Sequence, residues 1–525
     1  MPAYPNRARA FQPAVVATET SPIEMLATAS RVRNAPDAGL APASIRSSLR
    51  AADHSRVNIN RKNGMANSTG SRIGGGSADQ NPVTLFTQID YDGRCRCHQA
   101  DAFGLPCRTV HTEAATVGRP DRWGDEHLTT VVVIGSGFAG LWAALGAARR
   151  LDELAVPAGA VDITVLSAKP FHDIRVRNYE ADLSACRIPL ADLLDPVGIA
   201  HVATEVTAID GDARTVTTSG GVRYGYDRLV LASGSHVVKP AVPGLLKFGF
   251  DVDTYDGALA LQQHLRKLAD DAPRPAAATV VVVGAGLTGI EAACELPKRL
   301  RALFSWVDLS PRVIVIDRNL VGSDMGPSAR PVIEKALSDN GVETLTGVSV
   351  AAVTERGVSL SSGESLAAAT VVWCAGMRAS ALTEQLPVPR DRLGRVDVDD
   401  YLRVVGVPSV FAAGDVAAAR MDDEHLSVMS CQHGRPMGRY AGYNVISDLF
   451  DQPMLALRIP WYVTVLDLGP AGAVYTEGWD RVVVSTGAEA KVTKQTINTR
   501  RIYPPLTGNR ADLLAAAAPE LQARP

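Results

Sequence analysis

The sequence predicts an α/β protein in which one unit of strand, glycine turn and helix occurs twice, each time within a parallel sheet. β-branched residues at 130–134 lead into a glycine-rich turn and then into an Ala- and Leu-rich stretch. The same order recurs from residue 279. The chain has 525 residues, which is too long for one ordinary core, so several domains are expected.

The first unit carries a G-x-G-x-x-G turn between a strand at 130–134 and a helix expected over 141–151. The first glycine of such a turn permits the tight bend, the second lets the backbone approach a pyrophosphate, and the third lets the helix pack closely. A second strand at 161–166 and a later one at 229–231 complete the unit. The predicted dinucleotide-binding residues are Gly135, Ser136, Gly137, Phe138, Ala139, Gly140, Ser167, Ser233 and Gly234.

The second unit repeats this order and ends its second strand, 313–316, with an acidic residue. Asp317 is placed to accept the ribose hydroxyls of a dinucleotide and to repel a 2′-phosphate. NADH is therefore favoured, although Arg318 follows and leaves NADPH open. The predicted binding residues of this unit are Gly284, Gly286, Gly289, Asp317, Ala375 and Gly376.

A third element is the short strand at 407–413, which ends in Gly414 and Asp415. A carboxylate at such a strand end can accept hydrogen bonds from a polyol chain. The alternative is that Asp415 caps the helix that follows.

These residues, in this order, resemble the two-dinucleotide-binding-domain flavoproteins of the pyridine nucleotide-disulfide oxidoreductase superfamily, over residues 128–450. In that family the first site holds FAD, the second holds NAD(P)H, and the late aspartate binds the ribityl chain. The resemblance therefore implies FAD on the first turn and Asp415, with NADH on the second turn. It also implies two Rossmann-like FAD/NAD(P)-binding domains and a C-terminal α+β segment. The expected boundaries are 1–126 for an N-terminal extension, 127–253 and 391–450 for the FAD domain, 254–390 for the NAD(P)H domain, and 451–525 for the C-terminal segment.

Within that superfamily, segments 172–180 and 371–380 look most like those of type II NADH:quinone oxidoreductases. The resemblance implies that His172, Tyr179 and Glu180 line the flavin, with ordinary packing as the alternative. It implies that Glu291 lies near the nicotinamide, where it orients the ring or relays a proton. The alternative for Glu291 is a buried polar contact.

The segment 431–438 departs from that family where the electron acceptor binds. Gln432 matches a family glutamine and is expected at the cofactor, but Pro436 and Met437 replace a glutamine pair. Met437 is expected to give the acceptor pocket an apolar wall. Three functions stay open: an NADH dehydrogenase that reduces a quinone-like acceptor, a soluble NAD(P)H-dependent reductase of a protein carrier or an unknown small acceptor, and a flavin-binding interaction protein with little turnover.

Composition excludes other classes of protein. The 53 basic and 56 acidic residues leave a net charge of −3, which argues against nucleic acid as a partner. No apolar stretch is long enough to span a bilayer, so transmembrane insertion is not expected, while peripheral membrane contact and a homodimer stay open. The seven cysteines are an odd number, sparse and without paired spacing, which indicates a reducing compartment. We therefore expect a cytoplasmic protein, with contact at the inner face of the membrane left open.

Residues 1–126 have no sustained hydrophobic period and are predicted to be a largely disordered extension. An organelle transit peptide is less favoured than an over-extended start, with Met65 as a candidate for the true first residue. The extension also holds a Cys/His cluster that lacks the paired spacing of a zinc site, so no metal is expected. Its members are Cys95, Cys97, His98, Cys107 and His111.

Overall fold

The structure is a computed structural model that describes residues 86–89, 95–98, 128–271, 274–521 and 523–524. The chain divides into two units, residues 1–109 and 110–525. In the first unit, strands β1 (Phe86–Ile89) and β2 (Cys95–His98) form a two-stranded antiparallel sheet. The rest of the predicted extension, including Cys107 and His111, lies outside the described residues.

The second unit begins with a five-stranded parallel sheet in the order β23-β11-β3-β4-β7. Its central strand β3 is built from β-branched residues whose side chains are buried at 131–134, as both faces of a parallel sheet require. β11 and β4 flank β3 on opposite sides, so their carboxyl ends open a crevice where dinucleotides bind in such folds. The strands are β3 (Thr129–Ile134), β4 (Val161–Ser167), β7 (Ala200–Ala203), β11 (Arg228–Leu231) and β23 (Val410–Ala412).

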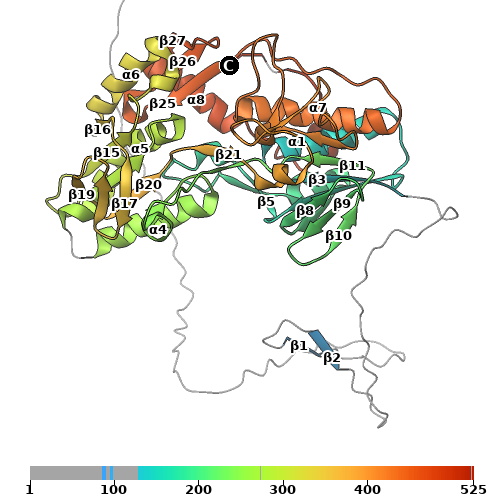
Figure 1. The fold of residues 1–525 in the computed structure, drawn as a ribbon, viewed down its shortest axis with the longest axis horizontal. Coiled ribbons are helices and arrows are strands. Elements are labelled where there is room, and N and C mark those ends of the chain that lie inside the picture. The colour runs from blue at the N-terminus through green and yellow to red at the C-terminus, as the bar shows by residue number, and fades with distance from the viewer. Residues whose placement is uncertain (1–85, 90–94, 99–127, 272–273, 522, 525) are drawn as a thin grey trace, which may run out of the picture. The chain divides into compact units, whose positions relative to one another are not determined.

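Two helices, α1 (Phe138–Glu153) and α7 (Cys431–Leu449), lie side by side against this sheet (Figure 1). Their backbones touch because glycines occupy the crossing. A Cβ atom on Gly438 would lie 2.3 Å from the Ala139 carbonyl oxygen, and one on Gly442 would lie 2.1 Å from that of Ala143. This close approach brings the start of α7 beside the first glycine turn.

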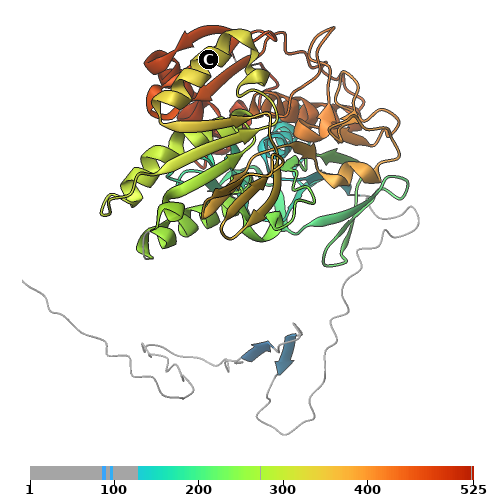
Figure 2. The same cartoon turned by 60° about the vertical axis from the view of Figure 1, so that its left-hand side comes forward.

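A second five-stranded parallel sheet has the order β13-β20-β14-β15-β16. β14 lies between β20 and β15, so the arrangement around the second glycine turn repeats that of the first. Figure 1 shows this sheet and its helices to the left of the first sheet, and Figure 2 brings them forward. The elements are β13 (Gly249–Phe250), just before the predicted boundary at 254, β14 (Thr279–Val283), β15 (Arg312–Asp317), β16 (Val342–Thr346), β20 (Thr370–Trp373), α4 (Tyr255–Asp270), α5 (Leu287–Leu303) and α6 (Gly326–Asp339).

Smaller elements connect and extend the two sheets. Two three-stranded antiparallel sheets are formed by β8 (Val206–Asp210), β9 (Thr215–Thr218) and β10 (Arg223–Gly225), and by β17 (Val350–Thr354), β18 (Gly357–Leu360) and β19 (Ser365–Ala367). Three pairs are β5 (Phe171–Asp173) with β6 (Arg187–Pro189), β12 (Ser235–Val237) with β21 (Met377–Ala379), and β22 (Val396–Asp397) with β24 (Ala417–Ala418). Two short helices are α2 (Ala191–Leu194) and α3 (Leu245–Phe248).

The C-terminal segment packs on both sheet domains. Its strands form an antiparallel sheet within the predicted C-terminal segment, and Leu466 joins the core of the second domain. Leu513 and Leu514 join the core of the first domain. The segment thereby carries polar side chains into the region between the domains. It consists of β25 (Val463–Asp467), β26 (Ala473–Glu477), β27 (Val482–Thr486), α8 (Gly487–Thr496), a π-helical turn at Ile497–Arg501 and α9 (Arg510–Ala516).

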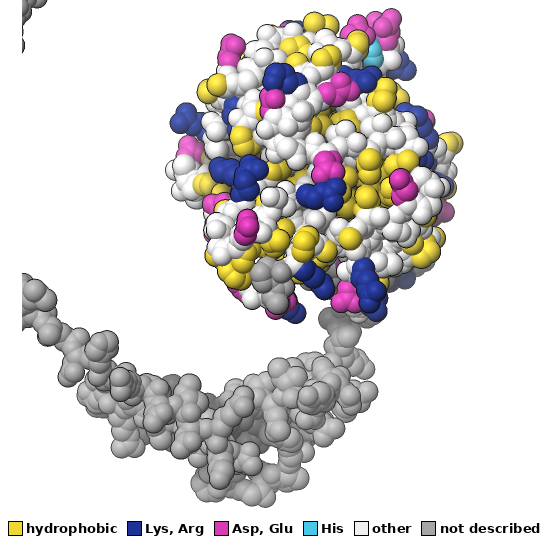
Figure 3. All heavy atoms as spheres, turned by 90° about the vertical axis from the view of Figure 1, so that its left-hand side faces the viewer, with side chains coloured by type: hydrophobic (Ala, Val, Ile, Leu, Met, Phe, Trp, Pro, Cys, Tyr) yellow, Lys and Arg dark blue, Asp and Glu magenta, His cyan; other side chains and the backbone are white. Residues whose placement is uncertain are grey.

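Within the described part of the chain, no helix combines the length and the hydrophobicity that crossing a bilayer requires. On the face of the molecule in Figure 3, basic and acidic side chains are interspersed. That face offers no field of one sign to a polyanion such as nucleic acid.

Candidate active site

A cavity of about 890 Å³ lies between the two sheet domains and the C-terminal segment, a volume typical of cofactor sites. Most of the predicted binding residues line it. These are Gly135, Ser136, Gly137, Phe138, Ala139, Ser167, Ser233, Gly234, Gly286, Gly376, Gly414, Asp415 and Gln432, together with the predicted catalytic residues Tyr179 and Glu291.

The three glycines of the first turn have different structural roles. Gly135 has φ +101°, and a Cβ there would lie 2.4 Å from the Ala232 carbonyl oxygen, so this position requires glycine. A Cβ on Gly140 would lie 2.0 Å from the Gly135 carbonyl oxygen, so only glycine lets α1 pack this close to the turn. Gly140 therefore contacts the backbone of the turn and does not line the cavity. Gly137 has open space beside it, and no side chain caps α1 there. The free N–H groups of α1 therefore face room for a phosphate.

The second turn repeats this geometry. Gly284 has φ +101° with its absent Cβ 2.9 Å from the backbone of Ala375, and a Cβ on Gly289 would lie 1.8 Å from the Gly284 carbonyl oxygen. Gly286 faces open space at the uncapped start of α5. Gly284, Gly289 and Ala375 thus shape this turn, while Gly286 presents it to the cavity.

The last residue of the strand that follows each glycine-turn helix differs between the two sites: it is Ser167 in β4 and Asp317 in β15. Asp317 accepts hydrogen bonds of 2.7 Å from the N–H groups of Ala285 and Asn319, so its carboxylate is fixed beside the second turn. Arg318 is exposed next to it. In the first site, the Ser167 hydroxyl donates to the Lys169 carbonyl oxygen at 2.9 Å and lies 2.9 Å from Nε2 of His201.

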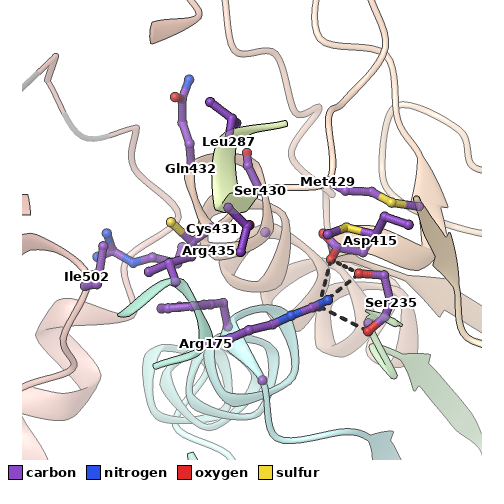
Figure 4. Close-up of a pocket in the computed structure, with 18 of the residues that line it drawn as sticks. Arg175, Ser235, Leu287, Asp415, Met429, Ser430, Cys431, Gln432, Arg435 and Ile502 are labelled. Atoms are coloured by element: carbon purple, nitrogen blue, oxygen red, sulfur yellow. Dashed lines mark hydrogen bonds and ion pairs between the residues drawn. The ribbon is translucent and has the colours of Figure 1, made fainter. Parts of the chain in front are cut away.

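Asp415 lies in a polar cluster on the cavity wall (Figure 4). The Ser235 hydroxyl donates to Oδ2 of Asp415 at 2.6 Å, and Nη1 of Arg175 lies 3.7 Å from the same oxygen. Burial raises the pKa of Asp415, opposed by the bond from Ser235 and the charge of Arg175. Among the described residues, the side chain of Asp415 caps no helix, so the capping alternative finds no support.

The cavity wall fits a flavin dinucleotide. The hydroxyl of Ser233 and Nε2 of Gln432 are buried and have no hydrogen-bond partner among the described residues. Both lie on the cavity wall, as do the open side of Gly137 and the carboxylate of Asp415. A ligand with phosphates, hydroxyls and a polar ring edge would satisfy them together.

His172 lies behind the first turn, outside the set of described residues that line the cavity. Its side chain is fully buried, and Nδ1 donates to the Ser136 carbonyl oxygen at 2.8 Å. Burial lowers the pKa of His172 to about 4, so the ring is neutral at physiological pH. His172 therefore positions the turn, whereas the resemblance implied that it lines the flavin.

Tyr179 and Glu180 are neighbours in sequence but have different surroundings. The Tyr179 hydroxyl lines the cavity and donates to Oδ2 of Asp467 at 3.2 Å. Glu180 accepts two hydrogen bonds from Arg177, of 2.9 and 2.6 Å, and one from Asn498. It lies outside the described lining, because these partners hold it in a separate cluster.

Glu291 forms a buried ion pair with Lys494, a residue that sequence reasoning missed. Nζ of Lys494 lies 2.7 Å from Oε1 of Glu291, which also accepts from the Asp467 N–H at 3.1 Å. Burial raises the pKa of Glu291 and Lys494 opposes this, while Glu291 raises the pKa of Lys494 against its burial. In the sequence, Lys494 belongs to a polar helical stretch with Lys491, a pattern typical of a solvated face, so no local signal placed it here.

The comparisons with known proteins decide the family. The family described as pyridine nucleotide-disulphide oxidoreductase matches residues 129–438. The chain belongs to this family. It is accordingly an FAD-dependent oxidoreductase that uses NADH, which confirms the predicted fold class, enzyme class and cofactors.

Two relatives and one solved structure show how far the similarity extends. The NADH dehydrogenase-like protein MT1860 of Mycobacterium tuberculosis is 80% identical over 400 residues, which are 76% of this chain and 100% of that protein. A type II NADH:quinone oxidoreductase of Staphylococcus haemolyticus is 28% identical, covering 71% of this chain and 95% of that protein. NDH2 from Plasmodium falciparum in complex with NADH shares the fold, with a TM-score of 0.59 and 13% identity. The match covers 74% of this chain and 97% of that structure's chain.

In this member of the pyridine nucleotide-disulphide oxidoreductase family, the cysteines at 186, 294, 374 and 431 form no disulfide. Cys186 and Cys294 are buried in the core, and Cys374 and Cys431 lie on the cavity wall as free thiols. Burial raises the pKa of Cys374 to about 12 and also raises that of Cys431. Both side chains are therefore protonated at neutral pH and are poor nucleophiles.

Segment 431–438, where the resemblance placed the acceptor, differs from the expectation at Met437. Its side chain is fully buried in the core of the first domain, so the prediction that it forms an apolar wall of the pocket was wrong. Helical periodicity is the reason, because Gln432, Arg435 and Arg439 share the face of α7 that lines the cavity. The arginines, which the sequence did not single out, occupy this wall instead.

Proposed function

We propose that this chain oxidises NADH and delivers the electrons to a quinone-like acceptor. The observation that carries the proposal is the single cavity that contacts both glycine turns and extends to an apolar wall of Trp461, Ile502 and Leu521. Such a wall fits a quinone ring, which is flat and largely apolar. The name of one relative, a type II NADH:quinone oxidoreductase, agrees with this acceptor, and that of another, an NADH dehydrogenase-like protein, agrees with NADH as the electron donor.

The chain's own residues would bind and orient the two nucleotides. The uncapped starts of α1 and α5 would hold the pyrophosphates at Gly137 and Gly286, and Asp415 would accept from the ribityl hydroxyls. When bound, FAD would supply the redox chemistry, since it accepts a hydride and returns electrons to a second substrate. The overall reaction converts NADH, a quinone and one proton into NAD⁺ and a quinol.

We assign Glu291 the role of orienting the nicotinamide. Its Oε1 is occupied by Lys494 and the Asp467 N–H, whereas Oε2 forms no hydrogen bond with the described residues and its side chain faces the cavity. Lys494 favours the ionised form of Glu291, which can accept from a carboxamide. Tyr179 lies beside the same network through Asp467, so it would supply a neutral hydroxyl to this end of the cavity.

The test is the steady-state rate of NADH oxidation with four acceptors: a soluble quinone, a long-tailed quinone, ferricyanide and a small iron–sulfur carrier protein. We expect the soluble quinone to be reduced, with saturation kinetics. Activity confined to ferricyanide, or to the carrier protein, would exclude a quinone pocket. A strict requirement for lipid with the long-tailed quinone would reveal a membrane contact of the C-terminal segment.

A further inference from the structure

A second cavity, of about 460 Å³, adjoins the first at Leu521, in the apolar wall that we propose for the quinone. The two share the wall formed by Arg435, Arg439, Arg501, Glu520 and Leu521. Arg500, on the π-helical turn of the C-terminal segment, adds a fourth arginine. Short π-helical turns occur often at functional sites.

Arg439 is the most unusual side chain of this wall. It is only 5% exposed, and its guanidinium carbon lies 4.2 Å from the ring centroid of Trp142 on α1. Among the described residues it forms no ion pair and no hydrogen bond, and its Nε is buried without a partner. Burying a charge without a counter-charge is costly, and among the described residues only the ring face of Trp142 directly offsets the charge of Arg439.

The neighbouring charges increase the demand for a counter-ion. Arg435 lies beside Arg439, with its guanidinium carbon 5.4 Å from the ring centroid of Trp142. Burial and the like charge of Arg435 lower the pKa of Arg439 to about 10, so the guanidinium stays charged at neutral pH. Glu520 faces these arginines but is exposed, and it forms no ion pair with a described residue.

We propose that this second cavity binds an oxyanion, and that the electron acceptor is a quinone-like molecule carrying such a group as a carboxylate or its equivalent. A guanidinium donates two parallel hydrogen bonds to an oxyanion, which matches the unsatisfied Arg439. Trp142, Tyr503 and Pro504 give the cavity a flat apolar wall suited to a ring. The proposal rests on the proposed function, since it refines the class of acceptor.

The spacing along α7 allows one molecule to occupy both cavities. Gln432 and Arg439 lie on one face of this helix, seven residues apart, which corresponds to about 10 Å along its axis. A bicyclic quinone with an acidic substituent spans roughly this length. Figure 4 shows Gln432 and Arg435 following one another along this face, with Ile502 on the same side of the pocket as Arg435.

The test measures binding directly, by isothermal titration calorimetry of the flavin-loaded oxidised enzyme. The probes are 1,4-naphthoquinone, its 2-sulfonate and the non-reducible naphthalene-2-sulfonate. We expect the sulfonated quinone to bind more tightly than the neutral quinone and to compete with naphthalene-2-sulfonate. Arg439→Met should weaken binding of both sulfonates by about 10- to 100-fold, the worth of a hydrogen bond to a charged group, and change neutral quinone binding by less than about 2-fold.

Two variants serve as controls. Arg439→Lys should keep part of the affinity, because the charge remains while the planar fork is lost. Arg392→Met removes an exposed arginine that does not line either cavity among the described residues, and it should leave all three affinities unchanged. If Arg439→Met does not fold, Arg435→Met carries the same expectation.

Equal affinity of the wild type for the neutral and the sulfonated quinone would overturn the proposal. So would an Arg439→Met variant whose affinities for the two quinones fall by the same factor. NADH oxidation with 1,4-naphthoquinone and with its 2-sulfonate is measured on the same samples. If NADH oxidation occurs with either quinone and the sulfonate binds no more tightly than the neutral quinone, the anion site is wrong and the quinone reductase stands. If neither quinone is reduced while the sulfonates bind through Arg439, the acceptor assignment is wrong and the anion site stands.

Discussion

Two buried histidines predict how the stability of the enzyme depends on pH. His172 and His433 are fully buried, and burial lowers the pKa of each from 6.5 to about 4. Protonation would place a second N–H of His172, at Nε2, where no described residue accepts it. In His433 it would break the bond that Nδ1 accepts from the Val428 N–H at 2.8 Å.

The sign and magnitude follow from proton linkage. Between pH 4 and 6.5 each histidine is protonated in the unfolded chain and neutral in the folded protein, so the free energy of unfolding falls as pH decreases. Each contributes a slope of about 1.4 kcal/mol per pH unit, and about 3 kcal/mol over the whole window. The variant His172→Asn can still donate to the Ser136 carbonyl oxygen. Because it lacks the titrating ring, the unfolded state binds one proton fewer in excess of the folded state.

The assay is urea unfolding at fixed excess FAD between pH 5 and 6.5, with the variant compared with the wild type. The slope of His172→Asn should be smaller by about 1.4 kcal/mol per pH unit, and that of His433→Asn by the same amount. Identical slopes in the wild type and both buried-histidine variants would refute the reasoning.

Three further predictions concern the nucleotide sites and the helix crossing. Gly137→Val should fold but lose FAD, because its side chain fills the phosphate space, whereas Gly220→Val, also in open space, should stay yellow; a flavin-loaded Gly137→Val would contradict this assignment. Asp317→Ala should raise KM for NADH by about 10-fold or more and change that for NADPH far less; a wild type that prefers NADPH would show that Arg318 dominates. Gly442→Ala should lower the free energy of unfolding by about 1–3 kcal/mol through overpacking, while Gly434→Ala, with its nearest contact at 3.8 Å, should not; equal midpoints in denaturant would argue against the backbone contact of α1 and α7.

The parts of the site that the sequence predicted are those encoded locally. A glycine turn needs only a strand before it, a helix after it and three glycines at fixed spacing, so Gly135, Gly137 and Gly140 could be placed from about a dozen residues. Asp415 was also found, because a short apolar strand ending in Gly-Asp is a local pattern. The pairing of β23 with β11 then explains why this late segment lies at the first turn.

The parts that the sequence did not predict depend on contacts between distant segments. Lys494 reaches Glu291 only because the C-terminal segment packs between the two domains. The orientation of α7 was likewise hidden, because its rotation is fixed by the glycine crossing with α1. That rotation turns Met437 into the core and Arg439 toward the cavity.

The central claim is that one cavity delivers electrons from NADH at the second glycine turn to an acceptor beyond the first. The most direct measurement is anaerobic titration of the bound flavin with NADH, followed by 1,4-naphthoquinone, in the wild type and in Gly286→Val. The Gly286 position faces open space, so the variant should fold and keep its FAD. We predict that NADH bleaches the wild-type flavin and that the quinone restores its colour, while the Gly286→Val flavin is bleached by dithionite and not by NADH. Equal bleaching of both proteins by NADH, or a wild-type flavin that the quinone does not reoxidise, would contradict the account.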